Sequence, residues 1–284
     1  MTDVTTGQRV KKIRAHREII NSIDRTMASG SGVELLATGS DDGTVKIWEG
    51  GDDAGKVAVA SFEIGCPVTS VCWGSDGNSV YIGALDNEVH VCCALFSMLS
   101  STDHAIFQVY DLRKVEQVSS LVGHVDTPSS LSLSPNGNYL LSPSFSSQTI
   151  VWDIRPFSPT ANRIHRVLQG APAGFEHTLL KGAWSKDDGG KRVAVGGADR
   201  MVCIWDVDSA KILYKVSSYL SSAFYMLIVR SKLPGHKGTV TSVDFHPKEP
   251  ISTSFTTRAR SPSMLTRIFS PDRKQRWNNA AGRN

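Results

Sequence analysis

The chain has 284 residues, of which 40% are hydrophobic and 20% are charged, so a disordered composition is excluded and a sizeable core is expected. The formal net charge of +4 is unevenly placed, because residues 251–284 hold seven Lys and Arg residues against one Asp. The rest of the chain is therefore slightly acidic, and a nucleic-acid-binding domain with a basic face is not expected there.

Cysteine content and hydropathy indicate the compartment. The five cysteines include no C-x-x-C pair, which argues against a disulfide framework or a zinc site and favours a reducing compartment. No signal peptide is visible near the start, and the longest apolar stretch, residues 216–229, is shorter than the roughly 20 residues that span a bilayer. We expect a soluble intracellular protein without a membrane segment.

The first repeat shows the pattern most clearly. Residues 5–10 read as the outer strand of a preceding repeat, which suggests truncation at the front. An apolar run at 35–38 then meets the Asp42-Gly43 turn, a strong hairpin signal. The strand that follows alternates apolar and polar residues and ends at Trp48, six residues after Asp42.

The second repeat is interrupted. Asp86 begins the expected phrase, but no Trp-Asp pair follows it. If residues 91–108 are removed, Tyr110 falls six positions after Asp86, and the repeat is restored with Tyr in place of Trp. We therefore interpret 91–108 as an insertion.

The third and fourth repeats again end in Trp-Asp. The third opens with Gly-His at His124 and ends at Trp152, with Ser146 where the other copies have Asp. The fourth runs from Asp199 to Trp205, again six residues apart.

A second interruption, residues 216–232, precedes the fifth repeat, which opens with Gly-His at His236 and decays after Ile251. Both interruptions begin with Val, whose codons start with GT, and end with Gln108 or Lys232, whose codons can finish in AG. GT and AG are the ends expected of an intron. We hypothesise that both are translated, unspliced short introns or errors of the gene prediction; genuine surface insertions are the alternative, because loops tolerate added length. Sequencing of the mature transcript distinguishes the two.

The order Gly-His, strand, turn, strand, Asp turn, strand, Trp-Asp is the WD40 signature. The sequence therefore predicts an all-β fold, a WD40 β-propeller with about five of seven blades present and an incomplete ring. The blades would occupy residues 1–250, interrupted at 91–108 and 216–232, and residues 251–284 would form a basic, disordered tail.

Each repeat combines residue types that also occur in a hydrolase triad. In the first repeat these are His16, Thr38 or Ser40, and Asp42. Because the set recurs in successive repeats, we interpret it as structural hydrogen bonding and expect no catalytic residues. The structural repeat residues expected are His16, Asp42, Trp48, Asp86, Tyr110, His124, Trp152, Asp199, Trp205 and His236.

Several stretches outside the generic signature resemble one family, the WD40 subunits of the spliceosomal U5 small nuclear ribonucleoprotein. The most specific are Arg-Pro-Phe at 155–157 and Phe-Glu at 175–176. The resemblance covers about residues 5–250 apart from the two insertions. The other stretches that carry it are residues 38–46, 131–134, 139–142, 151–154, 166–170, 179–180 and 211–215.

The resemblance implies a non-catalytic scaffold in pre-mRNA splicing, located in the nucleus. It implies spliceosomal protein partners, chiefly a large U5 scaffold protein, with no cofactor and no small-molecule substrate. The near-neutral body indicates that any RNA contact is indirect. Asp41, Arg155 and Arg200 are the candidate partner-binding residues, because they flank turns or strand ends.

Two other functions were weighed. A cullin ubiquitin ligase receptor is suggested by the Trp-Asp-x-Arg phrase of Trp152 and Arg155 and by its weaker copy at Tyr110 and Arg113. An enzyme is disfavoured, because no P-loop, Gly-x-Ser-x-Gly or His-Glu-x-x-His motif occurs. Metal binding was considered for one set with poor zinc spacing, namely His90, Cys92, Cys93 and His104. We expect no metal site.

Overall fold

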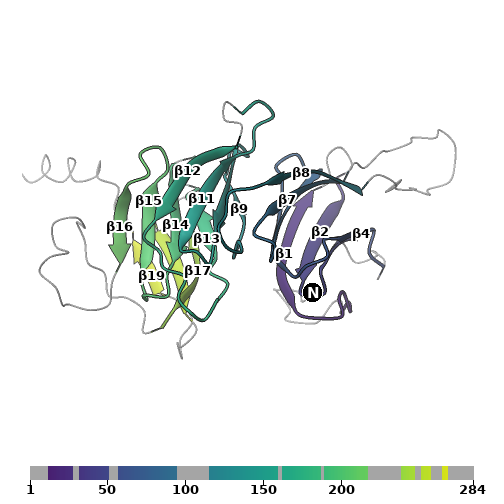
Figure 1. Cartoon of the computed structure of the whole chain (residues 1–284), viewed down its shortest axis with the longest axis horizontal. Coiled ribbons are helices and arrows are strands. Elements are labelled where there is room, and N and C mark those ends of the chain that lie inside the picture. The colour runs from purple at the N-terminus through teal and green to yellow at the C-terminus, as the bar shows by residue number, and fades with distance from the viewer. Residues whose placement is uncertain are drawn as a thin grey trace, which may run out of the picture.

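The computed structural model describes residues 12–27, 32–50, 57–94, 115–158, 162–186, 189–216, 238–246, 251–256 and 264–267. All nineteen regular elements in these ranges are β-strands, and they form five antiparallel sheets (Figure 1). Within the same ranges there is no helix long and apolar enough to cross a membrane.

The five sheets, which we call blades 1 to 5, follow one another along the chain. Blade 1 contains β1 (Ile20–Met27), β2 (Glu34–Ser40), β3 (Thr44–Glu49) and β4 (Ala60–Glu63). Blade 2 contains β5 (Val68–Trp73), β6 (Ser79–Ala84), β7 (Val89–Ala94) and β8 (Val115–Leu121). Blade 3 contains β9 (Ser132–Leu133), β10 (Tyr139–Pro143), β11 (Gln148–Asp153) and β12 (Ile164–Gln169). Blade 4 contains β13 (Gly182–Trp184), β14 (Arg192–Gly196), β15 (Val202–Asp206) and β16 (Ile212–Val216), and blade 5 contains β17 (Val240–Phe245), β18 (Ile251–Thr256) and β19 (Met264–Arg267).

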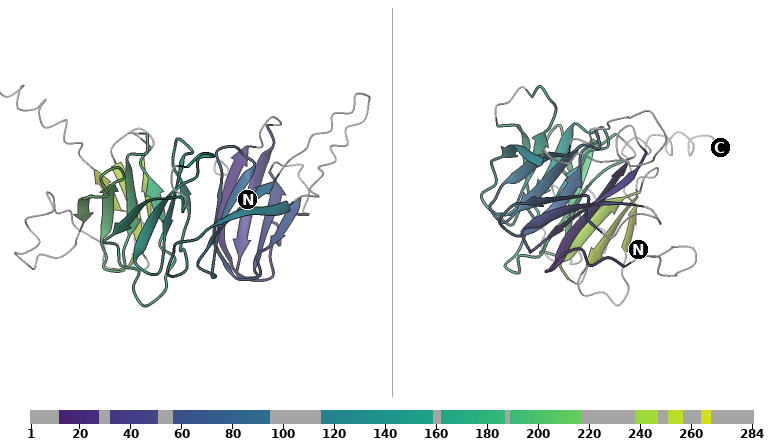
Figure 2. Two further views of the ribbon diagram at one scale, coloured as in Figure 1. Left: turned by 45° about the horizontal axis from the view of Figure 1, so that its top comes forward. Right: turned by 90° about the vertical axis from the view of Figure 1, so that its right-hand side faces the viewer.

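Strands within each blade pair in chain order, and consecutive blades pack face to face. Four apolar clusters fill the core, and each joins two adjacent blades: 1 with 2, 2 with 3, 3 with 4, and 4 with 5. Figure 2 shows the resulting side-by-side arrangement of the sheets. The predicted β-propeller is therefore confirmed, as an arc of five blades that does not close into a ring within the described residues.

The aromatic strand ends occupy one register position. Trp48 pairs with Leu36, Trp152 with Leu140, and Trp205 with Val193, always between the third and second strands of a blade. These Trp residues were predicted from their spacing. Each indole is at most 5% exposed because it packs beside the core between blades.

Blade 2 differs from the sequence expectation. Its β7 continues through residues 91–94, the first four residues of the expected insertion, and Cys92 pairs with Val80 at the register position of the Trp residues. The run Val-His-Val-Cys sustains a strand because it alternates and is rich in β-branched side chains. Tyr110 and residues 95–108 lie outside the described residues.

The end of the chain also differs. Residues 251–256 and 264–267, which were expected in a disordered tail, form β18 and β19 and complete a three-stranded blade 5. The Ile-Ser-Thr-Ser-Phe-Thr run of β18 has the β-branched composition that favours strands, and this outweighs the basic character of the segment. His236 and residues 217–232 lie outside the described residues.

Blade 1 exposes the face that the other blades bury. Ile23 in β1 has the register position of Val71 in β5 and Val243 in β17. Both valines are 3% exposed because the preceding blade covers them, whereas Ile23 is 64% exposed. Among the described residues, no sheet packs on this face of blade 1.

Candidate functional site

Blade 1 holds a buried chain of hydrogen bonds that links its turn to its aromatic strand end. His16 Nδ1 lies 3.0 Å from Asp42 Oδ2, and His16 Nε2 lies 2.7 Å from the hydroxyl of Thr38. The same hydroxyl accepts the indole N–H of Trp48 at 2.9 Å. The structure thus brings together the four signature residues that the sequence placed in one repeat, with Thr38 rather than Ser40 in contact with the imidazole.

The Asp42 carboxylate is the centre of this network. It accepts the backbone N–H of Arg17 at 3.1 Å and the hydroxyl of Thr44 at 2.7 Å in addition to the His16 contact. Burial raises the pKa of Asp42, but the hydrogen bonds from Thr44, Arg17 and His16 outweigh it and hold the pKa well below the ordinary range. Asp42 is therefore ionised and fixes the β2–β3 turn.

This arrangement is not that of a hydrolase triad. The Thr38 hydroxyl is bonded on both sides, and Thr38 is 6% exposed, so a substrate cannot reach it. A triad nucleophile instead faces a substrate cleft. The geometry assigns these residues to bracing the blade.

Blade 3 has an incomplete version of the network. His124 Nε2 bonds the Ser142 hydroxyl at 2.7 Å, but Ser146 occupies the position of Asp42 and bonds the Ser144 hydroxyl instead. Within the described residues, His124 Nδ1 and Trp152 Nε1 are buried without a hydrogen-bond partner. Burial alone lowers the pKa of His124 to about 4, so the imidazole is neutral at pH 7.

Blade 2 replaces the usual histidine. Cys66 follows Gly65 where blade 3 has Gly123-His124, and Asp86 is instead paired with His90 from β7, at 2.7 Å between Oδ2 and Nε2. Burial and the nearby Asp86 raise the pKa of the Cys66 thiol. Blade 2 therefore fixes its turn aspartate with a histidine of its own third strand, which the sequence pattern did not predict.

Blade 4 uses a lysine for the same purpose. Lys215 Nζ lies 3.0 Å from Asp199 Oδ2 and donates to the Gly170 carbonyl at 2.9 Å. The Trp205 indole donates to the Gln169 carbonyl at 3.0 Å. Blade 4 therefore keeps the turn aspartate and the Trp of blade 1, but a lysine takes the place of the histidine as the partner of that aspartate.

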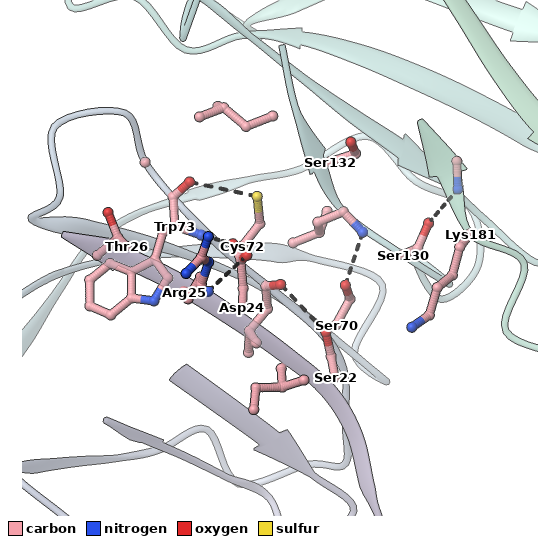
Figure 3. A pocket seen from close by; sticks show the side chains of 16 residues that line it. Ser22, Asp24, Arg25, Thr26, Ser70, Cys72, Trp73, Ser130, Ser132 and Lys181 are labelled. Carbon is pink, nitrogen blue, oxygen red and sulfur yellow. Dashed lines mark hydrogen bonds between the residues drawn. The ribbon is translucent and has the colours of Figure 1, made fainter. Parts of the chain in front are cut away.

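A cavity of about 440 Å³ lies where the first strands of blades 1 to 4 converge (Figure 3). Its hydroxyl groups connect neighbouring blades: Ser22 donates to the Val71 carbonyl, and the Ser70 hydroxyl accepts the Leu131 N–H at 2.9 Å. Ser130 likewise accepts the Gly182 N–H at 3.2 Å. These hydroxyls stabilise the arc, and the cavity lies along the contacts between neighbouring blades.

Metal binding finds no support in the described residues, where no group of three or more His, Cys, Asp or Glu side chains could hold an ion. His90 is bonded to Asp86, and Cys92 lies in the apolar core between blades 1 and 2. The side chain of Cys93 and the whole of His104 lie outside the part described.

The three residues predicted to bind a partner do not lie together. Asp41 and Arg200 lie in equivalent turns of blades 1 and 4, and Arg155 follows β11 at the opposite end of blade 3. Asp41 Oδ1 accepts Asn21 Nδ2 at 2.6 Å, and Arg200 has a left-handed backbone at φ 67°. The structure thus separates the candidates onto two faces of the arc.

Arg155 has an internal partner. Its guanidinium donates two hydrogen bonds to the Asp153 carboxylate, Nε to Oδ1 at 2.8 Å and Nη2 to Oδ2 at 2.6 Å. The hydrogen bond from Arg155 lowers the pKa of Asp153 below its ordinary value, despite burial. The Trp-Asp-x-Arg phrase therefore has a local structural role, and 41% of the Arg155 side chain remains accessible.

Comparison with known proteins gives relatives over most of the chain. The U5 small nuclear ribonucleoprotein 40 kDa protein of Pongo abelii is 36% identical over 249 residues, and that of Homo sapiens is 35% identical over the same length. Pre-mRNA-splicing factor cwf17 of Schizosaccharomyces pombe is 31% identical over 249 residues. Each alignment covers 88% of this chain but 57% to 60% of the relative, so the chain spans little more than half the length of these relatives.

The WD40 family model, described as WD domain, G-beta repeat, matches residues 7–49, 115–153 and 228–256. The first two segments end at Glu49 and Asp153, directly after Trp48 and Trp152 of blades 1 and 3. WD40 repeats matched at these positions, together with five antiparallel sheets that follow one another along the chain, show the fold of a WD40 β-propeller.

Proposed function

We propose that this chain is a non-catalytic protein-binding scaffold in pre-mRNA splicing. The observation that carries the proposal is its similarity, over 88% of its length, to proteins named for the U5 small nuclear ribonucleoprotein and for pre-mRNA splicing. A similarity that extends over several blades and their connecting loops is more specific than the repeat signature alone.

The physical character of the arc supports this role. Its signature His, Asp and hydroxyl groups are bonded inside the blades, and its cavity hydroxyls join neighbouring blades. What remains accessible are loops held on a rigid framework, which is the usual arrangement of protein-interaction surfaces. The proposed work of the molecule is therefore to hold partners in place.

We propose a nuclear location and spliceosomal protein partners, with a large U5 scaffold protein as the principal one. RNA contact is proposed to be indirect, because the residues before 251 carry a slight negative charge and RNA-binding domains usually present a basic face. The asymmetric position of the basic residues, gathered after Ile251, is the basis of this distinction.

Affinity purification of the tagged full chain from its source cells tests the proposal. Enrichment of U5 proteins over untagged controls is the expected result. Recovery of cullin adaptor proteins without spliceosomal proteins would support the receptor role instead, and recovery of neither set would refute the proposed function. An Arg155→Ala variant provides a control. If the wild type recovers a cullin adaptor and Arg155→Ala does not, the Trp-Asp-x-Arg phrase is identified as the contact with that adaptor.

A further inference from the structure

We propose that the end of blade 3 that carries Phe157 docks an acidic segment of a partner protein, with the Phe157 ring inserted into an apolar pocket of that partner. The inference rests on the scaffold role proposed above and names the surface that performs it. We define the Phe157 surface as Tyr139, Arg155, Phe157, Arg163 and His165, which lie at the start of β10, in the β11–β12 loop and at the start of β12.

Phe157 is 94% exposed, and described residues on both sides of it are held by hydrogen bonds. A single exposed apolar side chain is ordinary, but its loop here is anchored to the 3% exposed carboxylate of Asp153. Arg155 binds this carboxylate through two hydrogen bonds before Phe157, and Ser158 Oγ donates to it at 3.3 Å directly after Phe157. The anchor therefore encloses the aromatic residue on both sides.

A second brace comes from the start of β12. Arg163 Nη1 donates to the carbonyl of Arg155 at 2.8 Å and to that of Asp153 at 3.4 Å. A short segment held in this way, here residues 155–158, loses little conformational freedom when a partner binds, so more of the contact energy of the ring remains for affinity. An aromatic side chain held out from the fold by such a segment suits insertion into a partner.

Aromatic and guanidinium groups surround the base of the loop. The Tyr139 ring lies 4.7 Å from the His165 ring and 6.4 Å from the Trp184 ring, measured between centroids. The Arg155 guanidinium lies 5.7 Å from the Tyr139 centroid. Tyr, Trp and Arg are the residue types that dominate binding energy in protein interfaces. Tyr139 and Arg155 supply two of these residue types to the Phe157 surface, while Trp184 is 2% exposed and belongs to the core.

The charge of this surface selects the partner's chemistry. Three arginines, Arg155, Arg163 and Arg166, lie within it or beside it, against the two carboxylates of Asp153 and Asp208. The pKa of His165 is lowered, first by burial and second by the positive charge of Arg166. The carboxylates of Asp153 and Asp208 raise this pKa, but they offset the lowering only in part. The surplus is positive, so carboxylates on the partner complement it.

Protein fits this surface better than RNA does. Arg155 already donates to the Asp153 carboxylate, and Arg163 and Arg166 already donate to backbone carbonyls. Their guanidinium groups are oriented by the fold rather than extended toward a phosphate chain. An exposed phenyl ring with a modest positive surround matches an apolar pocket bordered by Asp or Glu.

A photo-crosslinking amino acid placed at Phe157 of the full chain in its source cells tests the proposal directly. The matched control carries the same crosslinker at Phe175, which is equally exposed and lies in the β12–β13 connection at the other end of the blades. The expected result is a crosslink from position 157 alone to a protein peptide with apolar residues flanked by Asp or Glu. A crosslink to RNA, a crosslink to a basic peptide or the absence of any crosslink from position 157 would overturn the inference.

Affinity measurements with the identified partner complete the test. Phe157→Ala is expected to weaken binding about 10- to 30-fold, the loss typical of a central interface residue, with partial rescue in Phe157→Leu and no change in Phe175→Ala. Equal binding by Phe157→Ala and the wild type would overturn the inference. If the wild type recovers spliceosomal proteins and Phe157→Ala recovers them equally, only this inference fails; if the wild type recovers none, the proposed function fails as well.

Discussion

Blade 3 offers a direct test of how the blades are braced, because its network lacks one group. Ser146 lies in a turn that matches the blade 1 turn bond for bond: the Ser146 N–H donates to Ser144 Oγ at 3.2 Å, as the Asp42 N–H does to Ser40 Oγ at 3.2 Å. Replacing Ser146 with Asp should therefore place a carboxylate within reach of His124 Nδ1, which is buried without a partner. We predict that Ser146→Asp stabilises the fold.

The magnitude follows from the bonds exchanged. A hydrogen bond to a charged group contributes about 1.5–3 kcal/mol, and the Ser146–Ser144 hydroxyl contact that is lost contributes about 1 kcal/mol. The expected gain is about 0.5–2 kcal/mol, or roughly 1–8 °C in Tm for a chain of this size. The carboxylate should also raise the pKa of His124 from about 4 toward or above its ordinary value.

The sign of the pH dependence makes the prediction specific. In the wild type, the unfolded chain binds a proton at His124 below about pH 6.5 while the folded chain does not until about pH 4, so stability falls as the pH drops between these values. In Ser146→Asp the folded imidazole binds that proton more readily, so the gain over wild type should be larger at pH 5.5 than at pH 7.5.

Urea unfolding followed by tryptophan fluorescence, at both pH values, measures the gain, and histidine NMR titration measures the pKa of His124. Ser146→Asn is the matched control: it offers an uncharged acceptor and should give a smaller gain and a smaller pKa rise. In a His124→Phe background, Ser146→Asp should give no gain. An unchanged His124 pKa, or an equal effect in both backgrounds, would refute the proposed bracing.

Three further predictions concern the packing of blades and their turns. Gly196→Ala should destabilise the fold by about 1–3 kcal/mol, because a Cβ there would meet backbone and side-chain atoms of β17; an unchanged urea midpoint would contradict the packing of blades 4 and 5. Val243→Ser should lower the free energy of unfolding by about 1–3 kcal/mol, because Val243 is buried. Ile23→Ser, at the same register position on an exposed face, should change that free energy by less than about 0.5 kcal/mol. Equal losses in the two variants would show that the face of blade 1 is covered. Asp42→Asn should lower the free energy of unfolding at pH 7, because the folded chain holds Asp42 ionised with a lowered pKa. The difference in stability from the wild type should shrink as the pH falls below about 4, where the wild-type carboxylate begins to take up a proton on unfolding. A stability difference independent of pH would contradict an ionised Asp42.

The parts of the fold that local pattern determines could be predicted from the sequence. The turn before Trp48, the strand that carries it and the equivalent elements ending at Trp152 and Trp205 depend on residues within a few positions of each other. The grouping of His16 with Asp42 was also predictable, since their roles recur at fixed places in a repeat.

Substitutions inside the repeat were harder to predict. Cys92 fills a position where the pattern demands an aromatic residue, so residues 91–94, which continue β7, were assigned to the expected insertion. In the same blade, His90 and not a Gly-His histidine binds Asp86, and in blade 4 Lys215 binds Asp199. These pairings depend on which side chains share a face of a strand pair, and a motif match does not contain that information.

The accessible surfaces could be predicted least. Asp41, Arg155 and Arg200 were chosen for their place beside turns, and the structure puts them on two opposite faces of the arc. The Arg-Pro-Phe stretch was noted only for its resemblance to a family, while the exposure of Phe157 and the bracing beside it depend on the buried Asp153 and on Arg163, which directly precedes β12. Exposure is a property of the assembled sheets, and no spacing rule gives it.

The scaffold role in splicing is tested most directly by sedimentation of a nuclear extract that contains the tagged full chain. We predict that the chain sediments with U5 small nuclear RNA in a particle far larger than its own 30.8 kDa, and that it remains there after enzymatic removal of unprotected RNA. Sedimentation of the chain apart from U5 small nuclear RNA, either as a free protein or with a ubiquitin ligase, would contradict the proposed function.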